Sequence, residues 1–122
     1  MPQRDWPATT QELSAELRNL RIGAPEVMKQ FSAIAQAALA PKALDAKTKA
    51  LIALAISVAV RCADCIAFHV KAARDQSASR EEILEALAMA IYMGAGPSVM
   101  YASHALGAFS QFEAAQAAQS GG

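Results

Sequence analysis

The chain has 122 residues, a size typical of one domain, and its 11 basic and 11 acidic residues give a formal net charge of zero. Without a basic stripe or a long run of one charge, neither nucleic acid nor a charged membrane surface is indicated as a partner. The apolar fraction of 54% is high for so short a chain, so we expect some apolar surface to be buried between subunits.

Helical patterns fill the N-terminal part of the chain, and no segment alternates apolar and polar residues as a strand would. The first predicted helix opens at residues 9–12 and ends near Gly23. The second begins at Pro25, which suits a first helical turn, and stops before Pro41. Two consecutive helices are therefore expected before residue 41.

A third helix is predicted from its cap at Asp45 to about Val60. From Leu51 onwards it is apolar nearly all round, so we expect a central buried helix. This apolar run is too short to cross a bilayer. The first residues of the chain also lack the apolar stretch of a signal peptide, so a cytoplasmic protein outside the membrane is expected.

A CxxC motif follows, with a histidine four residues after its second cysteine. Cys62 and Cys65 are the only cysteines, and His69 is one of two histidines. In a helix from about Cys62 to Asp75 the three side chains share one face. The thiols would lie in the first turn, which favours a thiolate, and an imidazole nearby can take a thiol proton. The leading interpretation is a redox-active dithiol.

Two alternatives remain open from the spacing. Structural zinc needs four ligands, and the motif offers three, so a fourth would have to come from His104, Asp64 or a partner subunit. The cysteines could also be two inert, buried side chains. Among the charged neighbours, Arg61 favours a thiolate and Asp64 opposes it, and the sequence does not decide the balance.

Two further helices are predicted after the motif. Ser79 and Glu82 match a capping box at the start of one, which ends at Gly94-Ala95-Gly96-Pro97. The last helix is expected from Ser98 to about residue 115. Three methionines of these two helices are expected to fill the core, namely Met89, Met93 and Met100.

Taken in order, residues 44–59, the CxxCxxxH motif, residues 79–87 and residues 94–97 resemble the carboxymuconolactone decarboxylase-like superfamily, nearest its alkylhydroperoxidase D-like branch. The resemblance covers roughly residues 25–115. It implies a compact all-α domain of about six helices that assembles into homotrimers or homohexamers. Residues 1–24 would form an N-terminal extension with the first helix, and residues 116–122 a flexible tail.

The resemblance also implies a reaction. Cys65 would attack a hydroperoxide, Cys62 would resolve the resulting sulfenic acid as a disulfide, and His69 would act as the base of a proton relay. An external dithiol would restore the pair, with no cofactor and no metal. The family relay usually includes a glutamate twelve residues before the first cysteine, where this chain has Ala50, so weakened turnover is expected.

Other functions of the same fold remain alternatives. One is a non-catalytic oligomeric or ligand-binding module that keeps the dithiol, and another is an enzyme of the carboxymuconolactone decarboxylase type. The second histidine, His104, could assist the relay from the last helix or could simply be a packed or solvent-facing side chain.

Overall fold

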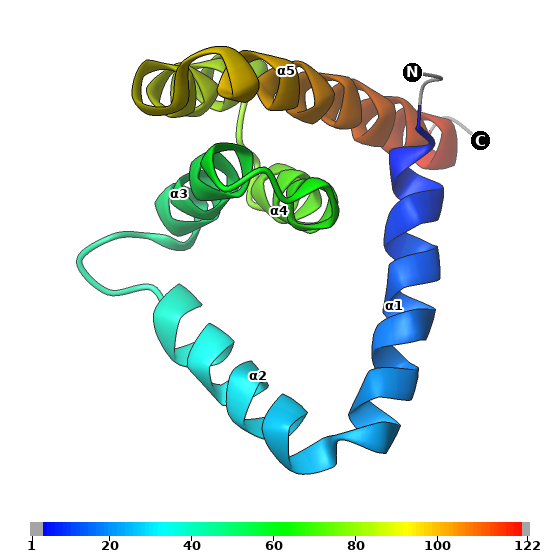
Figure 1. Ribbon diagram of the computed structural model, residues 1–122. Helices are drawn as coiled ribbons and strands as arrows, with labels where there is room; N and C mark the ends of the chain where they lie inside the picture. The colour runs from blue at the N-terminus through cyan, green and yellow to red at the C-terminus, as the bar shows by residue number, and fades with distance from the viewer. Residues whose placement is uncertain (1–3, 121–122) are drawn as a thin grey trace.

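The computed structural model describes residues 4–120 and is all-α over that range (Figure 1). This confirms the predicted fold class. The helices α3 and α4 pack on each other and on α5, while α1 runs from the end of α5 to α2. The bounds are α1 Trp6–Gly23, α2 Pro25–Leu39, α3 Ala46–Ala59, α4 Ala63–Asp75 and α5 Arg80–Ser120.

The long helix α5 is folded back on itself at Ala95, whose φ of 54° and ψ of −139° are not helical. Nη1 of Arg80 donates to Oγ of Ser110 over 3.4 Å, whereas a straight helix would separate these residues by about 45 Å. The two arms therefore lie antiparallel. A Cβ at Gly94 would collide with the Ser98 side chain, so a larger residue there would force Ser98 to move.

This bend lies where the sequence predicted one helix to end and the next to begin. The six predicted helices thus correspond to α1–α4 and the two arms of α5. At the N-terminus, α1 begins at Trp6, three residues earlier than predicted, because the Asp5 side chain accepts the N–H of Ala8 and caps it. At the other end the helix continues to Ser120. Residues 116–120 are therefore helical rather than a loose tail, and residues 121–122 lie outside the described part.

The core lies between α3, α4 and the arms of α5. Its largest fully buried apolar side chains are Leu54, Val58, Ile66, Val70, Ile83 and Phe109. The expectation that the methionines fill this core was wrong, because Met89, Met93 and Met100 are all exposed. Helix α3 is central as predicted, yet its Ile52 and Ile56 side chains are also exposed.

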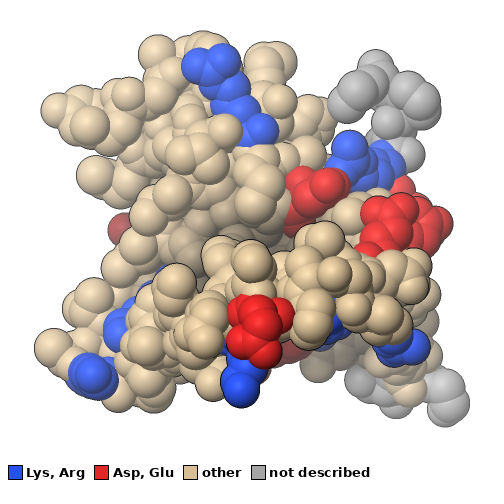
Figure 2. Space-filling model, turned by 60° about the horizontal axis from the view of Figure 1, so that its bottom comes forward, with Lys and Arg blue, Asp and Glu red and all other residues tan. Residues whose placement is uncertain are grey.

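Helix α2 differs from the others because none of its residues, all of which the structure describes, is buried. Val27, Phe31 and Ile34 follow helical spacing on one face and are 69%, 61% and 65% exposed. Lys49 ties the end of this helix to α3, since its Nζ donates to the carbonyls of Ala38 and Ala40 at 2.9 and 2.6 Å. The face of the molecule in Figure 2 shows wide areas without charged side chains.

By length and composition, one helix of the described chain, Arg80–Gln119, could span a membrane. The bend at Ala95 divides it into two antiparallel arms. The first arm, of about 15 residues, is only about 22 Å long against a hydrocarbon thickness of about 30 Å. Both arms contribute buried side chains to the core, although only 22% of the apolar window is buried, and one such helix is weak evidence for a membrane span.

Candidate redox site

The turn between α3 and α4 positions the first cysteine. Arg61 adopts a left-handed conformation with φ 61°, the N–H of Cys62 donates to the Ser57 carbonyl at 3.0 Å, and the N–H of Arg61 donates to the Val58 carbonyl at 3.1 Å. These bonds form a Schellman motif. Cys62 completes this C-terminal turn of α3 and is also the N-cap of α4. The motif thus begins at a point fixed by two helices.

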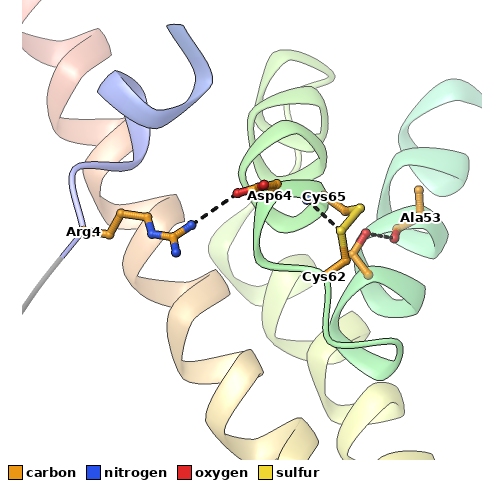
Figure 3. The surroundings of a disulfide bond; sticks show 6 residues. Arg4, Ala53, Cys62, Asp64 and Cys65 are labelled. Carbon is orange, nitrogen blue, oxygen red and sulfur yellow. Dashed lines mark hydrogen bonds and ion pairs between the residues drawn. A yellow bond between two sulfur atoms is a disulfide. The ribbon is translucent and has the colours of Figure 1, made fainter. Parts of the chain in front are cut away.

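Cys62 and Cys65 are joined by a disulfide, with their Cα atoms 5.2 Å apart, in the range usual for such bonds (Figure 3). Both residues are half-buried. The backbone N–H of Cys65 donates to Sγ of Cys62 over 3.2 Å, so this sulfur occupies the place of an N-cap oxygen. After reduction, the same N–H and the helix terminus would favour a thiolate on Cys62.

His69 lies one turn further along α4 than Cys65, on the same helical face. Its side chain is half-buried, and burial lowers the pKa of the imidazole from its ordinary value. The ring makes no hydrogen bond within residues 4–120, so neither sulfur is bonded to it in this oxidised state. A neutral imidazole at pH 7 is able to accept a proton.

The relay position is occupied by a small apolar side chain. Ala50 is buried in α3 and cannot transfer a proton. Ser57, two turns further along the same helix, is also buried. Its hydroxyl donates to the Ala53 carbonyl at 2.7 Å (Figure 3). His104 packs between aromatic rings, with its centroid 5.8 Å from that of Tyr101 and 6.4 Å from that of Trp6. These contacts are those of a packed histidine.

The described residues contain no group of three or more His, Cys, Asp and Glu side chains arranged as metal ligands. The sulfurs of Cys62 and Cys65 are bonded to each other, so neither is a free thiolate ligand. The zinc alternative would need the reduced pair and a fourth ligand that this arrangement of side chains does not supply.

Arg4 is a residue of this site that no sequence pattern indicated. Its Nη1 lies 3.5 Å from Oδ1 of Asp64, the residue between the two cysteines (Figure 3). Its guanidinium carbon is also 4.8 Å from the ring centroid of Trp6. Arg4 and Asp64 are far apart in the chain and follow no recognised spacing. No sequence signal could have paired them.

Curated relatives match most of the chain. An uncharacterized protein of Cupriavidus necator is 39% identical over 103 residues, covering 84% of this chain and 91% of its own length. An uncharacterized protein of Haemophilus influenzae is 38% identical over 106 residues, covering 87% of this chain and 94% of its own length. Neither relative's name states an activity.

Solved structures share the fold and the family. A carboxymuconolactone decarboxylase family protein from Legionella pneumophila has 48% identity and a TM-score of 0.85, over 88% of this chain and 96% of its own. A family protein from Thermotoga maritima, described as possibly involved in antioxidative response, has 31% identity and a TM-score of 0.79, over 92% and 94%. The carboxymuconolactone decarboxylase family also matches residues 25–108 directly. With both cysteines, the histidine and the helices that hold them inside the matched region, the chain belongs to this family.

Proposed function

We propose that the protein is a dithiol oxidoreductase that reduces hydroperoxides, as the alkylhydroperoxidase D-like branch of its family does. The observation that carries this proposal is the Cys62–Cys65 disulfide at the N-terminus of α4. A disulfide in a CxxC motif, at a helix end that favours thiolates, is the oxidised half of such a cycle.

The cycle has three steps. The Cys65 thiolate attacks the hydroperoxide, breaks its O–O bond and becomes a sulfenic acid, while the alcohol leaves with a proton. The Cys62 thiolate then displaces hydroxide, which leaves as water, and forms the disulfide. An external dithiol returns the pair to thiols and is itself oxidised. These steps require no cofactor or metal.

The site supports a role for each member. His69, kept neutral by burial, takes the proton of the Cys65 thiol. The N–H of Cys65, already bonded to Sγ of Cys62, stabilises the resolving thiolate. The Thermotoga maritima relative described as possibly involved in antioxidative response is consistent with this chemistry.

The working form in this proposal is a homotrimer or homohexamer in the cytoplasm. The exposed apolar face of α2, with Val27, Phe31 and Ile34, supports contact with a second copy of the chain. An isolated helix of this length is marginal in water, and within residues 4–120 α2 contacts only α1 and α3 while its apolar face stays exposed, so a second copy would supply the missing packing. Light scattering tests this; a monomer at micromolar concentration would count against it.

A second candidate is a non-catalytic oligomeric or ligand-binding module of the same fold. The observation that favours it is the buried Ala50 at the relay position, which leaves His69 without a proton acceptor there. In this case the disulfide would be structural, and the thiols would react with hydroperoxides no faster than free cysteine.

Stopped-flow oxidation of the reduced protein by several hydroperoxides separates the two candidates. We expect rapid thiol loss in the native protein and none in Cys65→Ser. The Cys62→Ser variant should react once and accumulate the sulfenic acid, because its resolving sulfur is gone. If the native protein reacts as slowly as Cys65→Ser with every hydroperoxide, the module is the better description.

A further inference from the structure

We propose that Arg4 is a positioning residue for the dithiol: it offsets the carboxylate of Asp64 and so favours the thiolate and raises the reduction potential of the Cys62–Cys65 pair. The inference rests on the proposed function for its biological meaning. Its physical basis is the contact of the two side chains, 3.5 Å from Nη1 to Oδ1 (Figure 3).

The N-terminal strap, residues 4–7, is held in place by one side chain of α5. Gln111 accepts the backbone N–H of Trp6 at its Oε1 over 2.7 Å, and its Nε2 donates to the Arg4 carbonyl over 2.8 Å. The Trp6 ring is buried, and the Arg4 guanidinium lies over it. In Figure 1 the start of α1 accordingly lies beside the end of α5. The strap therefore fixes Arg4 on both its backbone and its side chain.

Asp64 carries the negative charge that Arg4 offsets. It lies in the first turn of α4, between the two cysteines, and a carboxylate near a thiolate disfavours the ionised sulfur. Arg61 and His69 flank the motif along the chain, but neither forms an ion pair with Asp64 within residues 4–120. Arg4 does, and so it partly offsets the charge of this carboxylate. The side chains of the pair are 38% and 61% exposed, so screening by water and salt keeps the effect to a few-fold.

The consequence falls on thiol–disulfide exchange. When an external dithiol attacks the disulfide, one protein sulfur leaves as a thiolate, and a thiolate of lower pKa leaves faster. Stabilising that thiolate also stabilises the reduced pair and thus raises its potential. The strap lies before residues 25–108, where the family matches. Arg4 therefore acts on the motif from outside the matched residues.

The test compares alkylation rates of the reduced thiols at pH 7 and low salt, with the reduction potential measured against glutathione. Arg4→Gln should slow alkylation about two- to threefold and lower the potential by about 9 to 14 mV, the same factor at 29.6 mV per tenfold. Arg4→Lys should restore both values, and the difference should shrink in 1 M salt. Arg4→Gln combined with Asp64→Asn should return close to the native values.

The matched control is Lys71→Gln, which removes the cation of the Lys71–Asp75 pair at the other end of α4 and should change neither value. Equal rates in Arg4→Gln and the native protein would overturn the inference. So would a slowing that Arg4→Lys fails to reverse, because the strap would then act through shape. Alkylation needs no hydroperoxide, so these results are independent of whether the proposed peroxidase reaction occurs.

Discussion

The packed half of the molecule, α3 to α5, and the arm formed by α2 are built from equally apolar sequences but reach opposite results. Leu54 of α3 is completely buried, whereas Phe31 of α2 is 61% exposed. The packed half carries the disulfide and contains most of the buried core. The α2 arm contributes no buried residue, because its apolar face is not covered by any residue from 4 to 120. Apolar residues in this protein therefore lie in two settings, a buried core and an exposed face of α2, which we propose contacts a second copy of the chain.

The largest expected effect lies in the packed half, at the base. His69→Gln should lower hydroperoxide turnover by about 10²–10⁴-fold, the usual contribution of a general base. Because burial lowers the pKa of His69, the native activity should persist down to a pH below the ordinary histidine value of about 6.5 and then fall as the ring becomes protonated. Initial rates against pH measure this. His104→Gln is the matched control, and an equal loss of turnover in that variant would contradict the assignment of His69 as the base.

The free energy of unfolding should also depend mainly on residues of the packed half. The depressed pKa of His69 means that the unfolded chain binds more protons below about pH 6.5, so stability falls as the pH drops through that range. Leu54→Ala should remove about 2–5 kcal/mol of unfolding free energy at any pH, since it opens a cavity in the core. Denaturant titration measures the loss. Ile56→Ala, on the exposed side of the same helix, should cost far less in a dilute sample.

Substitutions in α2 should change the assembly of subunits rather than the folding stability of the chain. Phe31→Ser should weaken each subunit contact by about 1.5–3 kcal/mol, the value of burying one large apolar side chain. Light scattering over a dilution series should show dissociation at higher concentration than for the native protein. Gln36→Ser, on the opposite side of α2 from Val27, Phe31 and Ile34, is the control. If both variants assemble like the native protein, α2 is not the contact surface.

The smallest effect concerns the turn that ends α4. Ser77 has φ 65°, and Ser77→Gly should stabilise the packed half by about 0.5–1 kcal/mol because glycine adopts this conformation without strain. Ser77→Ala should give no such gain. A thermal melt that shows equal stability for the two variants would contradict the assignment of strain to this turn.

Local patterns predicted much of this structure. The cap at Asp45, the capping box at Ser79 and the break near Gly94 all lie where the sequence indicated them. The CxxC motif was expected at a helix start, and it lies there. Each of these features depends on residues within a few positions of one another, so sequence spacing carries the information.

Tertiary features could not be predicted in the same way. The exposure of Met93 depends on which side of a bent helix faces α3, and helical spacing alone does not define that side. The Arg4–Asp64 pair depends on the N-terminal strap docking on Gln111, more than 100 residues away in the chain. The roles of Cys65, Cys62 and His69 remain a proposal that the resemblance suggested and the geometry supports.

The central claim is that Cys62 and Cys65 together give two electrons to one hydroperoxide molecule and become a disulfide. Intact-mass measurement of the reduced protein after one equivalent of hydroperoxide tests it directly. The account predicts a loss of two hydrogen atoms per chain, with both thiols consumed together and one hydroperoxide reduced. An unchanged mass, or an added oxygen with one thiol still free, would contradict it.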